Sequence, residues 1–304
     1  MTSAPISLTH RRSTSERVIE LALLLSAVLG IVTTIGIIAV LAFQTIEFFR
    51  EINPLSFFTG TVWSATIRPY AYGVLPLVSG TLLVAGIAMI IGVPLGLLAA
   101  ILLAEYASPR VRNVLKPLLE TIAGVPTIVL GFFAISLLSP AILRPLLGPK
   151  EIGIFSALAG GIMVGFLVTP LIASISEDAM RAVPRGLREG AFAMGATRFE
   201  VVRKVVFPAA LSGIMASVIL ALSRAIGETM VVLLATGGQP NLTADPRDSV
   251  LTMTAFIAQI SYGETPQGSI QFKSLFAVGA TLFVMTLALN LLSAWVVRRF
   301  RTAY

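Results

Sequence analysis

The stretch Ser223-Arg224-Ala225-Ile226-Gly227-Glu228-Thr229-Met230 decides how the chain is interpreted, because it places charges inside a long apolar run, residues 212–235. A run of that length is enough for one helix to cross a bilayer, which takes about 20 residues. Arg224 falls near its middle. A charged side chain at the centre of a membrane helix costs about 2.5–3.5 kcal/mol on insertion scales, so a residue of this kind is retained for a reason.

A carboxylate follows this arginine at helical spacing. Glu228 comes four residues after Arg224, so the two would share one face of a continuous helix. The order Arg before Glu is the less favourable one for helix stability, so helix propensity does not explain the pair. Small neighbours such as Ser217 and Ala221 suit close approach by another helix. The residues alone leave two interpretations: contact with a transported ion, or a structural salt bridge between packed spans.

The composition indicates an integral membrane protein. The 304 residues are 56% hydrophobic and 12% charged, with a mean hydropathy of +0.91, whereas a soluble domain is about 25% charged. The chain has no cysteine and one histidine, His10, in a polar tail, which argues against metal sites and histidine-based catalysis. No phosphate-loop or dinucleotide fingerprint occurs. We therefore expect a protein without catalytic, metal or cofactor sites, and any nucleotide must bind to another chain.

Hydrophobic runs predict an all-α, polytopic fold with six transmembrane helices. A polar N-terminal tail, residues 1–17, precedes them. The second run is interrupted around residues 92–96, where a kink is expected. The predicted spans are residues 18–43, 74–104, 118–138, 153–176, 212–235 and 275–297.

The distribution of basic residues predicts the orientation. Six spans place both termini on one side, and 15 of the 22 Lys and Arg residues fall in the tails, in the loop between the second and third spans, or in the insert at 177–211. Only six fall in the segments on the other side. Because positive loops stay in the cytoplasm, the termini and the insert are predicted to be cytoplasmic, with residues 47–73 and 236–274 facing outward.

The insert at 177–211 is predicted to form a hairpin of two short helices. Pro184 suits the start of the first helix, and Gly195 suits a left-handed stop after it. Thr197 and Glu200 form a capping-box pattern for the second helix, which Pro208 is expected to end. The hairpin cannot bury its apolar faces alone, so it either packs under its own spans or docks on a partner. Its place between two spans and its four acidic residues argue against DNA binding.

Part of this hairpin resembles the EAA loop of ABC importer permeases, the binding-protein-dependent transport system inner-membrane components. Residues 189–195 read Glu-Gly-Ala-Phe-Ala-Met-Gly, and an apolar-Pro segment follows at 206–210. Gly190 replaces the first alanine of the pattern. The resemblance implies a coupling helix that sits in a cleft of an ATPase subunit. The residues that carry over to this ATPase-coupling role are Glu189, Gly190, Ala191, Gly195 and Pro208.

A second resemblance narrows the family. Residues 224–230, Arg-Ala-Ile-Gly-Glu-Thr-Met, are similar to the signature of phosphate ABC transporter permeases. Residues 72–82, Tyr-Gly-Val-Leu-Pro-Leu-Val-Ser-Gly-Thr-Leu, resemble a run of the PstC-type subunit. The likeness extends over residues 18–300, with a core at 74–297. It implies the type I (MetI-like) permease fold and a role for Arg224 and Glu228 in translocation.

The resemblance also implies an assembly. Its members form an ATP-driven, high-affinity importer of inorganic phosphate in the bacterial inner membrane. The expected partners are a PstA-like second permease, a PstB-like ATPase dimer that binds ATP and Mg, and a PstS-like phosphate-binding protein, with no nucleic acid. The alternatives are a PstA-type role or a permease for sulfate, molybdate or phosphonate. A secondary transporter would leave the hairpin without a partner, and an intramembrane enzyme would need a catalytic constellation that the spans lack.

Some further polar and aromatic residues have structural expectations. Asn290 and Thr286 are expected to bond another helix. Trp63, Tyr70 and Tyr72 fit an exposed aromatic belt at the membrane interface. Glu105, at the end of the second span, is expected at the interface, and Lys116 is expected to pair with Glu120 one turn away.

Overall fold

The computed structural model describes residues 14–148, 151–263 and 265–300, so most of the predicted tail at 1–17 lies outside the described residues. The described chain is almost entirely helical, as expected. The α-helices are α1 (Thr14–Glu51), α2 (Pro54–Thr59), α3 (Leu75–Ile101), α4 (Pro109–Ala123), α5 (Thr127–Phe133), α6 (Arg144–Leu147), α7 (Ala157–Arg181), α8 (Arg185–Ala193), α9 (Arg198–Val201), α10 (Phe207–Ala209), α11 (Leu211–Ile226), α12 (Met230–Ala235), α13 (Met253–Tyr262) and α14 (Ile270–Phe300). Three π-helical turns and one two-stranded antiparallel ribbon complete the elements: η1 (Leu102–Tyr106), η2 (Ala134–Leu143), η3 (Val202–Val206), β1 (Trp63–Ser64) and β2 (Ala71–Tyr72).

Five helical segments among the described residues are long and apolar enough to cross a membrane, and the number is six when a bent pair is counted as one span. The bent pair joins Arg198–Ala209 to Leu211–Ile226 at an angle of 71°. The five single segments are Glu16–Glu51, Leu75–Tyr106, Thr127–Leu147, Ala157–Arg181 and Ile270–Trp295. The predicted six-span, all-α membrane fold is confirmed.

Two predicted spans have the wrong limits. The third was placed at 118–138, but its first residues belong to α4, and the span begins at Thr127 after a break at residues 124–126. Pro126 lies at the start of the new helix and disfavours helical geometry in the residue before it. The fifth, placed at 212–235, is not one helix, because α11 ends at Ile226 and α12 starts only at Met230.

Helices α3 and α7 pack closely through glycines on both sides. Gly92 and Gly96 of α3 face Val168 and Ile172 of α7, while Gly161 and Gly165 of α7 face Ile87 and Ile91 of α3. A Cβ on Gly96 would lie 2.7 Å from the Cβ of Ile172. These are two small-xxx-small motifs in contact, the usual route to close helix approach in membranes. The helix does not end at the predicted interruption at 92–96, because α3 continues through it with Pro94 inside the helix.

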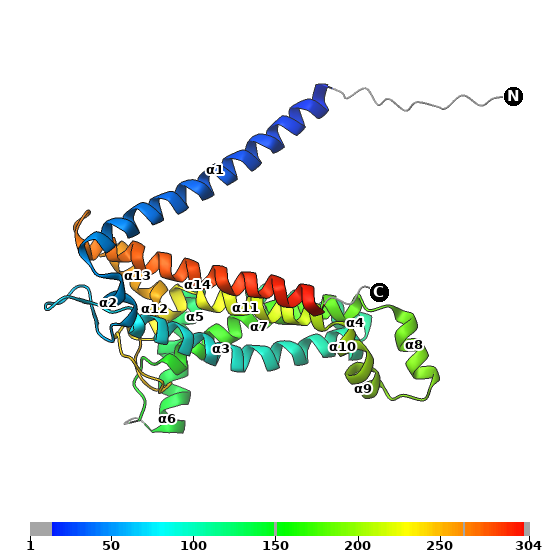
Figure 1. The fold of residues 1–304 in the computed structure, drawn as a ribbon. Coiled ribbons are helices and arrows are strands. Elements are labelled where there is room, and N and C mark those ends of the chain that lie inside the picture. Colours follow the sequence, from blue (N-terminus) through cyan, green and yellow to red (C-terminus); the bar gives the residue numbers. More distant parts are fainter. Residues whose placement is uncertain (1–13, 149–150, 264, 301–304) are drawn as a thin grey trace.

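The two ends of the molecule carry different elements (Figure 1). We call the end that carries α8–α10 the hairpin end, and the end that carries α2, α6 and residues 236–252 the loop end. The last described turn of α14 lies toward the hairpin end, and α1 leans away from the bundle. Helix α1 contacts α14 near the loop end, where Thr45 Oγ1 donates to the carbonyl of Phe276 at 3.1 Å.

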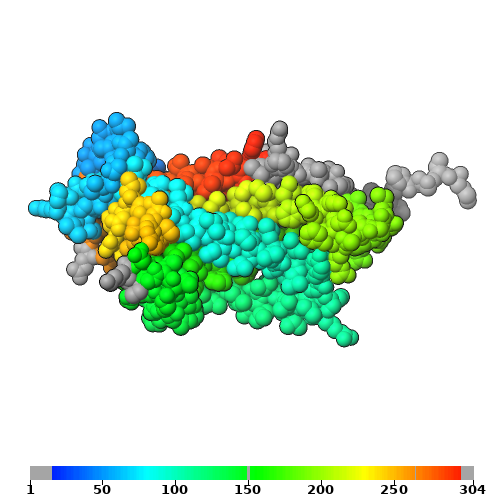
Figure 2. Space-filling view, turned by 90° about the horizontal axis from the view of Figure 1, so that it is seen from below, coloured from blue at the N-terminus to red at the C-terminus, as the bar shows by residue number. Residues whose placement is uncertain are grey.

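Aromatic side chains close the loop end. Trp63 packs edge-to-face on Phe256 at 4.8 Å between ring centroids and on Tyr72 at 5.9 Å. The contact between Trp63 and Phe256 holds the segment near residue 60 beside the segment that follows residue 240. The two segments lie side by side in Figure 2. The prediction of an exposed belt is wrong for Trp63 and Tyr72, which are buried, while Tyr70 is exposed. Burial raises the pKa of Tyr72 to about 12.

Candidate functional site

The stretch around Arg224 is a break in the fifth span rather than a continuous helix. Gly227 is the C-cap of α11, and Thr229 is the N-cap of α12. The Glu228 carboxylate accepts a bond from the amide of Val231 at 3.4 Å, and Thr254 Oγ1 donates to the Glu228 carbonyl at 2.6 Å. Glu228 is therefore buried, and it holds the start of α12 against α13.

Arg224 lies one turn before the break, and its side chain is exposed. It forms no hydrogen bond or ion pair with any residue that the structure describes. Helix α11 packs on α3, α7 and α14, and its remaining side carries Leu220, Arg224 and Gly227, all exposed. We call this the open side of α11. Charged residues within spanning helices face a bundle interior or a water-filled cavity, which makes the open side of α11 a candidate lining for a path.

The expected pairing of Arg224 with Glu228 is not formed. The i,i+4 argument needs an unbroken helix through both residues, and α11 ends at Ile226. The carboxylate turns to α12 instead, while the guanidinium stays on the open side. The two expected translocation residues are thus close in sequence but have different local roles.

Other interhelical bonds lie next to this break. Ser223 Oγ donates to Asn290 Oδ1 at 2.9 Å, which confirms that Asn290 bonds another helix. Thr286 bonds only carbonyls of its own helix, so that prediction is wrong. A pocket of about 360 Å³ opens beside the break and is lined by Thr229, Thr254 and Tyr262 among others.

The hairpin, residues 182–210, has the predicted outline. Gly195 has φ +84° and follows α8, as expected for a left-handed stop. The Thr197–Glu200 capping box is present, with the Thr197 amide donating to Glu200 Oε2 at 3.0 Å. Pro184 is the N-cap rather than the first helical residue. Pro208 does not end the second arm, because it lies inside α10, and the chain bends only at Ala210.

The two arms of the hairpin differ in how they pack: the second arm packs under the spans, whereas the first arm is exposed. Val201 and Val206 of the second arm are buried under the spans, with Met180 and Ile214 in the same cluster. The first arm, α8, has no buried residue, and Met194 at its end is 88% exposed. Of the residues in the EAA resemblance, Glu189 and Gly190 are exposed and Ala191 is partly buried. Helix α8 thus presents its surface outward from the bundle.

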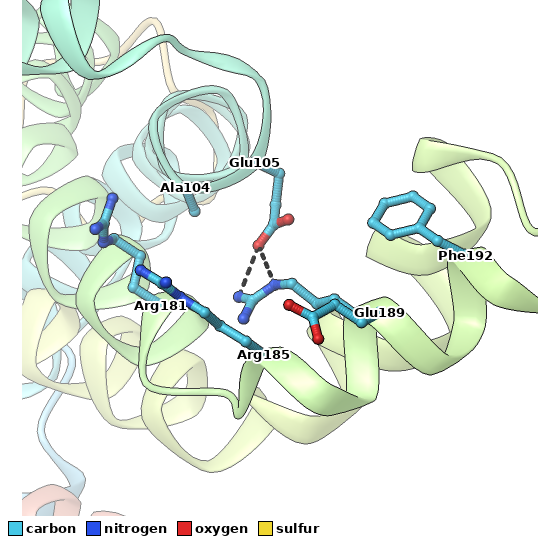
Figure 3. A pocket seen from close by; sticks show the side chains of 7 residues that line it. Ala104, Glu105, Arg181, Arg185, Glu189 and Phe192 are labelled. Carbon is cyan, nitrogen blue, oxygen red and sulfur yellow. Dashed lines mark hydrogen bonds and ion pairs between the residues drawn. The ribbon is translucent and has the colours of Figure 1, made fainter.

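A pocket of about 380 Å³ lies between α8 and the hairpin ends of the spans (Figure 3). Its walls carry three arginines and two glutamates, and the carboxylate of Glu105 points into it toward α8. Arg188 of α8 binds that carboxylate through Nη2 at 2.9 Å. Glu105 was expected at the membrane interface, but its side chain is only 8% exposed and is held by this ion pair.

A second buried carboxylate lies nearby and was missed in the sequence. Glu177 of α7 is fully buried and accepts bonds from Arg112 at 2.7 Å and from Lys116 at 2.6 Å, both in α4. The predicted Lys116–Glu120 pair is therefore wrong. The pKa of Arg112 is raised because its guanidinium donates a hydrogen bond to the Glu177 carboxylate. Burial lowers the pKa of Lys116, but its bonds to Asp178 and Glu177 outweigh burial, so the pKa of Lys116 is raised as well. The sequence held one signal for this ion-pair site: Glu177 directly follows the end of the predicted fourth span, on the same side as the basic loop between the second and third spans.

The described residues offer no group of three or more His, Asp or Glu side chains that could hold a metal ion.

At the loop end, Arg247 binds Glu151 at 2.7 Å and Asp245 at 2.6 Å. The bonds from Arg247 lower the pKa of Asp245 to about 2.

Comparison with known proteins places the chain in a family. Residues 92–302 match the family described as "Binding-protein-dependent transport system inner membrane component". The chain is 35% identical over 269 residues to the "Probable ABC transporter permease protein YqgH" of Bacillus subtilis, covering 88% of this chain and 85% of that protein. It is 32% identical over 283 residues to the "Phosphate transport system permease protein PstC 1" of Mycobacterium tuberculosis, covering 82% and 83%.

Solved structures agree on the fold. A bacterial alginate ABC transporter in complex with its pentasaccharide-bound periplasmic protein superposes with a TM-score of 0.64 at 17% identity, covering 95% of this chain and 99% of that one. The inward-facing MetNI methionine ABC transporter gives a TM-score of 0.55 at 20% identity, covering 75% and 94%. The chain belongs to the binding-protein-dependent transport system inner-membrane components, the multi-pass permease subunits of ABC transporters.

Proposed function

We propose that the chain is a PstC-type permease subunit of an ATP-driven importer of inorganic phosphate, and that phosphate passes Arg224. The observation that carries this is the unpaired guanidinium of Arg224 on the open side of α11. Relatives named as phosphate transport permeases support the choice of ion. An arginine suits a phosphate because its planar donors bind two oxygens at once and it stays charged in an apolar setting.

The open side of α11 also supports a two-permease assembly. One chain leaves Leu220 and Arg224 uncovered within a spanning helix, so a second permease, PstA-like, completes the path. Helix α8, with its exposed Met194 and Leu187, docks on a PstB-like ATPase dimer that binds ATP and Mg. The loop end faces outward and receives a PstS-like binding protein. Transport then proceeds by alternating access, in which ATP binding moves the hairpin from the cytoplasmic side.

Uptake into vesicles tests this function. The chain is co-reconstituted with its second permease, ATPase and binding protein, and uptake of radiolabelled phosphate is measured with and without ATP. We expect ATP-dependent uptake that excess sulfate or molybdate leaves unchanged. Arg224→Gln should lower it at least about tenfold, since it removes a hydrogen-bonding charge, with the complex still co-purifying. Competition by sulfate or molybdate would instead favour the other-oxyanion alternative.

Glu228→Gln separates the charge of Glu228 from its structural bond. Glutamine keeps an oxygen that can accept from the amide of Val231, so α12 should still form. A fall in phosphate uptake with normal assembly would assign a role to the negative charge in releasing the ion. Unchanged uptake would leave Glu228 as the residue that shapes the break, and Arg224 alone as the ion contact.

A further inference from the structure

Arg188 is the most extensively bonded side chain of the hairpin. Its guanidinium donates to Glu105 Oε1 through Nε at 3.2 Å and Nη2 at 2.9 Å. It also donates through Nη1 to the carbonyl of Val183 at 2.6 Å and through Nη2 to that of Met180 at 2.7 Å. The Arg188 side chain of α8 thus binds both the end of α7 and the turn η1 that ends the second span.

These bonds matter because α8 has few other attachments. It has no buried residue, and only Ala191 packs partly against the cluster beneath the spans. Three residues, 182–184, connect α8 to α7. A force on α8 would reach α7 through that short connection, and the Arg188–Glu105 pair is the ion pair that joins α8 directly to the second span, beside the apolar contact of Ala191 with the cluster that contains Ala100.

Glu105 is well placed to receive such a force. It lies in the π-helical turn η1, which continues α3 directly. Single π-helical turns are frequent at functional sites. Helix α3 packs along α7 through the glycine contacts and also contacts α11, the helix that carries Arg224. A continuous set of contacts therefore links α8 with the open side of α11.

We propose that Arg188 is a positioning residue that couples α8 to α3 and α7 together, so that both spans move when the ATPase moves the hairpin. The inference rests on the proposed function, since it assumes that an ATPase docks on α8. A neutral contact would fix the hairpin less well, because hydrogen bonds to charged groups in a partly buried site are roughly twice as strong as neutral ones. Figure 3 shows the geometry, with both bonds to Glu105 drawn beside Glu189 and Arg185.

Glu105→Gln tests the pair most cleanly. It removes the negative charge at η1 but leaves the Arg188 bonds to the Met180 and Val183 carbonyls. In the reconstituted complex we expect co-purification with the ATPase and ATP hydrolysis within about twofold of the unmodified complex, while phosphate transported per ATP falls about tenfold, as for one charged hydrogen bond lost. Arg188→Lys keeps the charge without the planar fork and should give an intermediate ratio.

Asp178→Asn is the matched control. It likewise turns a carboxylate at the hairpin end into an amide, but this carboxylate pairs with Lys116 of α4 at 2.6 Å and not with α8, so the ratio of phosphate to ATP should stay unchanged. The proposal is overturned if Glu105→Gln leaves that ratio unchanged, if hydrolysis and uptake fall in the same proportion, or if Asp178→Asn uncouples equally.

A distance measurement tests the same pair without relying on the identity of the transported ion. The sequence has no cysteine, so spin labels on Leu102→Cys and Gly186→Cys report only these sites, and a Cβ at Gly186 meets nothing within 4 Å. We expect one narrow distance that ATP does not change, and a broad, ATP-dependent distribution after Glu105→Gln. A narrow, unchanged distance after Glu105→Gln contradicts the inference. Failure of phosphate uptake in the unmodified complex contradicts the proposed function instead.

Discussion

At the scale of single residues, three buried carboxylates have partners within the chain, whereas the exposed Arg224 has none among the described residues. Glu105 and Glu177 are both held by cations at the hairpin end, and Glu228 is bonded at the start of α12. Arg224 forms no hydrogen bond or ion pair with the described residues. Because the three carboxylates are satisfied as they stand, Arg224 is the member of this set that is available for an ion or for a neighbouring subunit.

The buried carboxylate of Glu177 should be important for stability rather than transport chemistry. Glu177→Gln removes a charge that satisfies Arg112 and Lys116, and should lower the free energy of unfolding by about 1–3 kcal/mol. Thermal unfolding in detergent measures this effect. The neighbouring Asp178→Asn is the control, because the Asp178 side chain is 63% exposed and an exposed pair contributes at most about 1 kcal/mol. Equal effects of the two substitutions would contradict this assignment.

At the scale of elements, close packing of α3 on α7 depends on the absence of side chains. Gly96→Ala would push a Cβ to 2.7 Å from Ile172 and 3.1 Å from the carbonyl of Thr169. Overpacking of this kind costs about 1–3 kcal/mol. Because α3 and α7 are joined along their length, we expect the melting temperature of the purified protein to fall.

Gly86→Ala, in the same helix, provides the comparison. A Cβ there meets nothing within 4 Å, so the change should be neutral, or stabilise α3 by up to about 1 kcal/mol through helix propensity. A melting temperature that responds equally to Gly86→Ala and Gly96→Ala would show that the glycine contact is not what holds the two spans together.

The elements also show how far sequence patterns reach. Apolar runs were sufficient to predict the number of spans. Local turn residues were sufficient to predict the left-handed stop at Gly195 and the Thr197–Glu200 capping box, because the deciding contacts lie within a few residues. The break after Ile226 was missed, since the run stays apolar through it and Thr254, a distant residue, binds its carbonyl. Burial of Trp63 depends on Phe256, far along the chain, which no periodicity reveals.

At the scale of the whole molecule, the two ends differ in their elements, and the open side of α11 lies between them. The hairpin and the last described turn of α14 lie toward one end (Figure 1), and the aromatic cluster around Trp63 packs at the other. Between them the open side of α11 carries Arg224. Since the permease family works with further subunits, we propose that this side borders the path that two permeases enclose.

Cysteine labelling in the assembled transporter tests that proposal most directly. Leu220 lies one turn before Arg224 on the open side and is 49% exposed, while Ile90 of α3 is an apolar residue that is 75% exposed elsewhere in the spans. In a chain without native cysteine, a water-soluble thiol reagent should label Leu220→Cys, and phosphate with ATP should slow that labelling but not the labelling of Ile90→Cys. If Leu220→Cys stays unlabelled, or is labelled at a rate that phosphate does not change, the open side does not border the phosphate path.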